Sequence, residues 1–215
     1  RIHSKSSILL DDGVICKAKY ILLATGGTPS KLQIKGEKLA ITSNEIFSLT
    51  SLPKTLTIIG GGYIACEFAS IFNGLGTKVT LVYRGEMILR GFDHDIRDQV
   101  DRVMRSNGVV IKNNTEIISI DKVEGSLAVE LSNGDKQFSE QVLLAVGRQA
   151  RTEGLGLDRV NMGLTKSGAI QVDEFQKTSV ESIYAVGDIT DRFNLTPVAI
   201  RDAAAYVKTF FEGKR

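Results

Sequence analysis

Cysteine, proline and charge imbalance are scarce in this sequence, and each scarcity excludes a class of protein. The two cysteines among 215 residues form neither a metal-ligand spacing nor a CxxC pair, so we expect no metal site and no thioredoxin-like chemistry. With only 3 prolines, the chain is neither collagen-like nor of low complexity. No apolar run approaches the roughly 18 residues of a membrane span. The 27 basic and 25 acidic side chains leave a net charge of +2, which gives no global attraction to nucleic acid or to anionic lipid.

What the sequence does contain is typical of a globular protein. Hydrophobic residues make up 42% of the chain and charged residues 24%, and 215 residues predict one or two domains. The chain starts at Arg1 rather than at Met, without a signal-like segment, so we expect it to be a piece of a longer protein.

The opening part of the chain predicts short strands and turns. Ser7–Leu10 and Val14–Ile15 flank an Asp-Asp-Gly turn and are typical of a β-hairpin. The apolar run Lys19–Ala24 predicts a strand that is buried on both faces. A short helix is expected from Asn44, with Ser43 as its capping residue.

From Thr55 the pattern becomes strand, glycine loop, helix and strand. Leu56–Ile59 predicts the first strand, and Gly60-Gly61-Gly62 the loop that follows it. Tyr63–Leu75 has apolar residues at spacings of three and four, which is typical of a helix packed on one side. Lys78–Tyr83 predicts a second strand, so this segment forms one βαβ unit.

The rest of the chain predicts two more helices and several strands. Helices are expected at 95–107 and 196–212, and strands at 109–111, 116–122, 127–131, 137–146 and 182–186. The apolar side of the first of these helices consists of Ile96, Val100, Val103 and Met104. Because strands precede and follow a complete βαβ unit, one domain is expected to be inserted into another. The predicted fold is α/β: a Rossmann-like three-layer domain with a β-meander, inserted into part of a similar domain.

The glycine loop matches the dinucleotide-binding fingerprint, with alanine in its third place: Gly60-x-Gly62-x-x-Ala65. The first glycine permits a tight turn, and the second lets the backbone approach a pyrophosphate. The small third residue lets the helix pack closely on the strand. The free amides and the positive end of the helix dipole would then face the phosphates. Because the motif follows a strand and opens a helix, we favour a nucleotide site over a merely structural turn.

The end of the second strand predicts which dinucleotide binds. A site for NAD places an acidic residue about 20 residues beyond the loop, where it accepts hydrogen bonds from the ribose. This sequence has Arg84 there and Arg90 six residues later, whereas Glu86 comes one position too late and is interpreted as solvated. Guanidinium groups match a 2′-phosphate in charge and geometry, so NADPH is predicted. The alternative is a pair of solvated surface cations.

Four segments together resemble the flavin-dependent disulfide reductases, in the order and spacing of that family. They are Thr55 to Ala69, Ala24 to Gly27, Ala145 to Arg148, and Ile183 to Asp188. Within the family the sequence resembles most the glutathione reductases of plants and bacteria. The segments that carry this closer resemblance are Arg90 to Asp93, Val172 to Gln176, and Thr190 to Ala199.

The resemblance implies a domain layout. Residues 1–27 would be part of an FAD-binding domain, residues 28–149 an NADPH-binding domain, and residues 150–215 the return to the FAD-binding domain. Thr25-Gly26 would mark the crossing into the inserted domain and Gly147-Arg148 the way back. A C-terminal dimer-interface domain would follow in the family.

The resemblance also implies roles for single residues. Tyr63 would be the lid over the nicotinamide pocket, and Glu67 the carboxylate that pairs with a lysine beside the flavin, although no lysine of this chain is an obvious partner. Asp188 would bind the ribityl chain of FAD. Thr196 would cap the helix beneath the flavin, with Pro197 as its first residue; the alternative is an ordinary capped helix. The expected cofactor-binding residues are Thr25, Gly26, Gly60, Gly61, Gly62, Ile64, Arg84, Arg90, Gly147, Arg148, Asp188, Leu195 and Thr196.

By resemblance the chain is the central part of an NADPH-dependent glutathione-disulfide reductase, in which hydride passes from NADPH to FAD and on to a disulfide. The family's first FAD-phosphate loop, its redox-active cysteine pair and its catalytic His-Glu segment are absent from this sequence, so the chain alone is expected to be inactive. A cytoplasmic homodimer is expected for the parent protein, with neither nucleic acid nor membrane as a partner. The alternatives are trypanothione reductase or another disulfide reductase of the family, and an isolated NADPH-binding module without catalysis.

Overall fold

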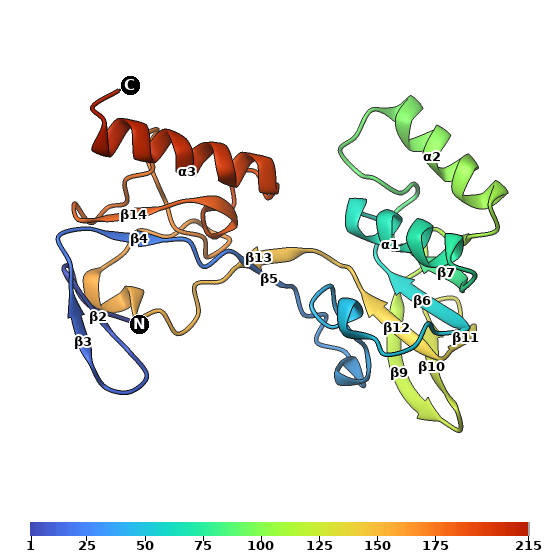
Figure 1. The fold of residues 1–215 in the computed structure, drawn as a ribbon. Coiled ribbons are helices and arrows are strands. Elements are labelled where there is room, and N and C mark those ends of the chain that lie inside the picture. Colours follow the sequence, from blue (N-terminus) through green and yellow to red (C-terminus); the bar gives the residue numbers. More distant parts are fainter. Residues whose placement is uncertain (215) are drawn as a thin grey trace. The chain divides into compact units, whose positions relative to one another are not determined.

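The computed structural model describes residues 1–214 and divides the chain into two compact units (Figure 1). Unit 1 comprises Arg1–Thr28 and the chain from Arg148 onward, and unit 2 comprises Pro29–Gly147. The first boundary lies one residue later than expected from the sequence, and the second lies two residues earlier. In the part of the chain that the structure describes, no helix has the length and apolar character needed to cross a membrane.

Unit 2 is built on a four-stranded parallel sheet. Its order is β12 (Gln141–Leu144), β6 (Thr55–Ile59), β7 (Lys78–Val82) and β8 (Val110–Lys112). The strands are short apolar runs because both faces of a parallel sheet are covered. Since all four strands are parallel, their carboxyl ends lie at the same edge, and the loop after β6 begins at that edge.

Helices cover one face of this sheet, as Figure 1 shows. Helix α1 (Tyr63–Gly74) buries Ala65, Phe68 and Ala69 against β6 and β7, which confirms the predicted βαβ unit. Helix α2 (His94–Ser106) begins after Asp93, whose Oδ1 accepts a hydrogen bond from the Asp95 backbone N–H at 3.0 Å.

The predicted apolar side of α2 is only partly buried. Met104 is buried and Val100 packs against the core, but Ile96 is 54% exposed and Val103 is 44% exposed. The sequence pattern therefore overestimated how much of this helix faces the sheet. The short strand that follows, β8, offers little surface for a helix of 13 residues to cover.

An antiparallel meander covers the other face of the sheet. It consists of β9 (Ile117–Val123), β10 (Ser126–Leu131) and β11 (Lys136–Ser139), with β10 in the middle. Its buried side chains pack against Ile59 and Val82 of the parallel sheet. Helices, parallel sheet and meander form the three layers that the sequence predicts.

The single strand expected at 137–146 is wrong, because the chain changes sheet at Glu140. Residues before this point pair in the meander as β11, and residues after it pair with β6 as β12. The Glu140 backbone N–H donates to Thr55 Oγ1 at 2.9 Å, and Glu140 Oε2 accepts a hydrogen bond from the Lys54 N–H at 2.7 Å. These bonds hold the chain at the start of β6 and separate the two strands.

The short helix predicted from Asn44 is also corrected. The structure has one 3-10 turn at Ile46–Ser48, whose N-cap is Glu45 rather than Ser43, and no side chain caps it. Thr42 donates from both its backbone N–H and its hydroxyl to Glu45 Oε2, at 2.8 and 2.6 Å. The same hydroxyl accepts a hydrogen bond from the Asn44 N–H, and the bonds from Thr42 lower the pKa of the Glu45 carboxyl. A second 3-10 turn lies at Glu37–Leu39.

Unit 1 starts with an antiparallel sheet in the order β1 (Ile2–Ser4), β2 (Ser7–Leu9) and β3 (Ile15–Lys17). The predicted hairpin is confirmed by the pairing of Leu9 with Ile15. The 3-10 turn Leu157–Val160 packs beside this sheet and buries Leu157 with Ile2 in one apolar cluster.

Two strand pairs and one helix complete unit 1, although the last residue of β5, Pro29, is already counted in unit 2. Strand β4 (Ile21–Leu23) pairs in parallel with β14 (Ile183–Ala185), and β5 (Gly27–Pro29) pairs with β13 (Arg148–Ala150). Helix α3 (Thr196–Phe211) follows the 3-10 turn Gly187–Thr190.

The strand predicted at 19–24 is not buried on both faces. Tyr184 on β14 contacts Tyr206 and Phe210 of α3, with ring centroids 5.0 Å apart in both pairs. Leu22 on β4 is nevertheless 43% exposed. The face of β4 that carries Leu22 is therefore only partly covered by other parts of unit 1.

Candidate nucleotide-binding site

Gly60 makes the turn after β6 possible. Its φ of +134° lies in the region that favours glycine, and a Cβ atom at this position would lie 2.2 Å from the Ala145 carbonyl oxygen. The Gly60 N–H donates to the Val82 carbonyl at 2.9 Å, which ties the turn to the end of β7. No other residue fits here without moving the backbone.

The second glycine of the run is closed in by an aromatic ring. A Cβ atom on Gly61 would lie 2.5 Å from the ring of Tyr83, and one on Gly85 would lie 2.6 Å from the same ring. Tyr83 therefore packs against both glycines, directly before Arg84. No sequence motif points to this ring, although it directly follows the end of β7.

Gly62, in contrast, is open. It is the N-cap of α1, with φ −80° and ψ 178°, and nothing lies within 4 Å of the position that a Cβ atom would take. No side chain caps the helix, so the first N–H groups of α1 keep their hydrogen-bonding capacity for a ligand. An open backbone at the positive end of a 12-residue helix fits a pyrophosphate.

Arg84 and Arg90 are both exposed, and neither forms an ion pair within the described residues. Backbone hydrogen bonds hold both neighbours of Arg84: the Tyr83 carbonyl accepts from the Thr115 N–H at 3.0 Å, and the Gly85 carbonyl from the Asn114 N–H at 2.9 Å. The arginine therefore extends from a fixed piece of backbone and remains available to an anionic ligand.

The segment that carries Arg90 is attached to the glycine loop. The Leu89 N–H donates to the Gly61 carbonyl at 2.6 Å. From α2, Arg97 donates through Nε to the Ile88 carbonyl at 2.8 Å and through Nη2 to the Met87 carbonyl at 2.7 Å. Sequence reasoning missed Arg97, because the pattern shows only an arginine on a polar helix.

The predicted residues on α1 lie on its outer side. Tyr63 is 36% exposed and Glu67, one turn later, is also exposed, while Ile64 packs against the core. Glu67 forms no ion pair with any described residue. Glu67 lies on the side of α1 that faces away from the sheet.

Cys66 lies on the buried side of the same helix. Burial, with smaller contributions from the charges of Asp101 and Glu67, raises the pKa of its thiol to about 11. Its sulfur stays protonated near neutral pH and forms no disulfide, so Cys66 acts as a small buried hydrophobic residue.

In unit 1 the structure brings three of the predicted motifs together. Arg148 Nη2 donates to the Gly27 carbonyl at 2.6 Å, and Thr25 Oγ1 donates to the Arg151 carbonyl at 3.0 Å. A Cβ atom on Gly27 would lie 3.4 Å from Asp188 Oδ2, so Asp188 lies directly beside this glycine. The three motifs that contain Thr25, Arg148 and Asp188 thus meet within one unit.

The start of α3 lies next to this cluster. Gly187 has a φ of +76°, and a Cβ atom there would be 3.3 Å from the Ala199 side chain. The predicted cap is wrong by one residue: Leu195 is the N-cap, because its carbonyl accepts the N–H bonds of Val198 and Ala199. Thr196 and Pro197 are therefore the first two helical residues, and no side chain caps the helix.

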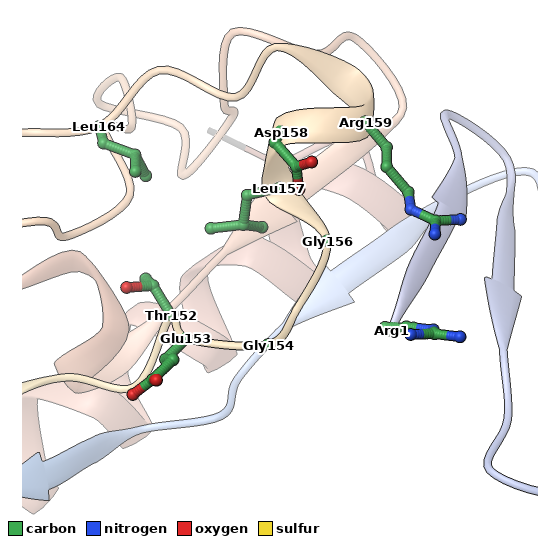
Figure 2. A pocket seen from close by; sticks show the side chains of 9 residues that line it. All are labelled: Arg1, Thr152, Glu153, Gly154, Gly156, Leu157, Asp158, Arg159 and Leu164. Atoms are coloured by element: carbon green, nitrogen blue, oxygen red, sulfur yellow. The ribbon is translucent and has the colours of Figure 1, made fainter.

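A cavity of about 430 Å³ lies elsewhere in unit 1 (Figure 2). Basic Arg1 and Arg159 line it together with acidic Glu153 and Asp158, so its charge favours neither anions nor cations. None of the predicted site residues lines it. Within the described residues, no group of three or more potential metal ligands occurs.

The parallel sheet, the glycine loop and the uncapped helix that follows it give unit 2 a Rossmann-like α/β fold. A comparison with models of protein families identifies the family of the chain. Residues 2–203 match the family described as pyridine nucleotide-disulphide oxidoreductase, and the chain belongs to it. The resemblance noted in the sequence is thereby confirmed.

Individual relatives agree with this assignment. The chain is 45% identical over 202 residues to a glutathione reductase of Burkholderia cepacia, which covers 94% of this chain and 45% of the relative. It is 45% identical over 201 residues to a trypanothione reductase of Leishmania donovani, covering 91% of this chain and 41% of the relative. The chain thus spans less than half the length of these relatives.

A solved structure shows the same fold. The HOCl-induced flavoprotein disulfide reductase RclA of Escherichia coli matches with a TM-score of 0.94 at 28% sequence identity. The match covers 100% of this chain and 50% of the RclA chain.

Proposed function

We propose that this chain is the central part of an NADPH-dependent flavoprotein disulfide reductase that acts on glutathione disulfide. Members of the family use FAD and NADPH, and relatives 41–45% identical to the chain are named glutathione reductase. Residues 28–149 would bind NADPH, and residues 1–27 and 150–215 would each supply part of a flavin site.

One observation carries the NADPH assignment. An open glycine loop at an uncapped helix is followed by Arg84 and Arg90, both exposed and without an ion pair in the described part of the chain. The amides of the loop would hold the pyrophosphate, and the two guanidinium groups would hold the 2′-phosphate that distinguishes NADPH from NADH. When bound, NADPH and FAD supply the two-electron transfer.

Other residues would act around these groups. Tyr63, at the start of α1, would cover the nicotinamide pocket, and Glu67 would orient a cationic partner. Asp188 would hold the ribityl chain, and the uncapped N-terminus of α3 would stabilise negative charge on the flavin. The remaining proposed contacts come from Thr25, Gly26, Ile64, Gly147, Arg148, Leu195 and Thr196.

The nucleotide assignment is tested by Arg84→Ala. A hydrogen bond to a charged group contributes about 1.5–3 kcal/mol, so we expect affinity for NADPH to fall roughly 10- to 150-fold and affinity for NADH to stay nearly unchanged. Arg102→Ala is the matched control, because Arg102 pairs with Asp98 on α2 and lies outside the proposed site. Fluorescence titration of both nucleotides measures the effect. Equal losses for NADPH and NADH would remove the 2′-phosphate contact from the proposal.

The proposal that unit 1 supplies part of an FAD site has a direct test. The chain holds Asp188 and the start of α3, but its sequence contains only one dinucleotide-binding fingerprint, at Gly60 to Ala65. A purified chain with a flavin absorbance spectrum supports a usable partial FAD site. A colourless chain that binds NADPH supports the alternative of a nucleotide-binding module without catalysis.

The substrate is tested on the complete protein. We expect NADPH oxidation with glutathione disulfide, and a faster reaction with trypanothione disulfide would favour the alternative that the Leishmania relative represents. A homodimer in the cytoplasm belongs to the same proposal, and size-exclusion chromatography of the complete protein tests the dimer.

A further inference from the structure

The segment Met87–Arg90 has an unusual backbone. Leu89 has a φ of +55° although it is not glycine, and Gly91 has a φ of +95°. A leucine rarely takes this conformation, so surrounding contacts must hold it. Leu89 is buried, and its N–H donates to the Gly61 carbonyl at 2.6 Å. The conformation of this segment and that of the glycine loop are therefore linked.

Arg97 supplies the other contacts. Its Nε and Nη2 donate to two consecutive carbonyls, those of Ile88 at 2.8 Å and Met87 at 2.7 Å. The side chain is half-buried and forms no ion pair among the described residues.

The place of Arg97 in α2 is unfavourable for the helix itself. Its backbone N–H donates to the Asp93 carbonyl in the first turn, where the helix dipole disfavours a cation. The other two arginines of this helix, Arg102 and Arg105, pair with Asp98 and Asp101 one turn earlier. Arg97 alone among them directs its guanidinium to the backbone of the segment that carries Arg90.

We propose that Arg97 is a positioning residue for nucleotide binding, which holds Met87–Arg90 in the conformation that presents Arg90 to the 2′-phosphate. The inference rests on the proposed function. A long side chain on α2 fixes two carbonyls of the segment, and Leu89 fastens the same segment to Gly61. Without Arg97 the segment would open, and only the fraction of molecules with the ordered segment would bind NADPH fully.

The test compares three variants of the chain. Arg97→Met removes both donors, Arg97→Lys keeps a charged donor, and Arg102→Met is the control on the same helix. If the ordered fraction falls to about a tenth, NADPH affinity falls about tenfold in Arg97→Met, while NADH affinity changes much less. Arg97→Lys should lie between Arg97→Met and the unmodified chain, and Arg102→Met should match the unmodified chain.

A second measurement needs no nucleotide. In the unliganded chain, hydrogen exchange of the Leu89 amide in this segment, which is bonded to the Gly61 carbonyl, should become faster in Arg97→Met and remain unchanged in Arg102→Met. The inference is overturned if exchange in this segment stays slow, or if NADPH and NADH lose affinity equally. Where Arg97→Met does not fold, Arg97→Lys decides by the same criteria. If the unmodified chain does not prefer NADPH, the proposed function fails, and the exchange rates alone decide whether Arg97 orders the segment.

Discussion

Strands β6 and β4 are both short, apolar and parallel to their partners, yet their surroundings differ. β6 has a strand on each side, and its Ile58 is fully buried in the core between the sheet and α1. β4 has β14 as its only strand neighbour in the described part of the chain, and its Leu22 is about half exposed. Because a two-stranded sheet is marginally stable, unit 2 should hold its site by itself more firmly than unit 1. The nucleotide part of the proposal is therefore the part that this chain can test directly.

The largest expected effect is a difference in stability between a variant in β6 and a variant in β4. Ile58→Ala leaves a cavity in a closed core and should lower the free energy of unfolding of unit 2 by about 3–5 kcal/mol. Leu22→Ala removes a half-exposed side chain and should cost less than about 1 kcal/mol. Urea unfolding followed by amide exchange in each unit measures both values. Similar costs for the two variants would contradict the comparison.

A second pair of variants separates stability from binding within unit 2. Gly60→Ala forces a side chain into a positive φ and against the Ala145 carbonyl, so the free energy of unfolding should fall by about 2–5 kcal/mol. Gly62→Ala meets no atom within 4 Å and should leave the melting temperature nearly unchanged. Its methyl group would occupy the open approach to the helix N-terminus and should weaken NADPH binding about tenfold or more. Calorimetry and nucleotide titration give the two readouts, and unchanged NADPH affinity in Gly62→Ala would show that no phosphate binds there.

The smallest expected effect is a difference in reactivity and ionisation between the thiols of the two units. Cys16 in unit 1 is exposed and should react with a thiol reagent at once, whereas Cys66 in unit 2 should react only when that unit unfolds. The folded-state pKa of Cys66 is about 11, above its ordinary value of 9.0, so the unfolded thiol ionises first as the pH rises. The protonated thiol makes its full contribution to the free energy of unfolding below about pH 9. As the pH rises toward 11, this contribution is lost and the free energy of unfolding falls by about 2 kcal/mol.

Unfolding midpoints at about pH 8 and about pH 11 measure this loss, with Cys66→Ala as the control that should lack it. Cys16→Ala should behave like the unmodified chain. A fast reaction of both thiols in the folded protein would mean that the core around α1 is open.

Local patterns predicted much of unit 2. The strand, glycine loop and helix from Thr55 to Gly74 follow from apolar periodicity and from glycines at the turn. The change of sheet at Glu140 was not predictable in this way, because Thr55 and Lys54 cause it and lie 85 and 86 positions away. The predicted helix caps were misplaced by two positions at Ser43 and by one position at Thr196, since neighbouring residues compete for the same backbone bonds.

The amino-acid sequence alone determined the glycine loop after β6 and the excess of arginine over acid beyond β7, because these depend on residues close together in the chain. Only the tertiary structure showed that Tyr83 closes in Gly61 and that Arg97 holds the segment with Arg90. It also showed that Leu22 stays exposed. Such features depend on which distant segments pack together, and a side chain's contacts are decided by that packing rather than by the type of its neighbours in sequence.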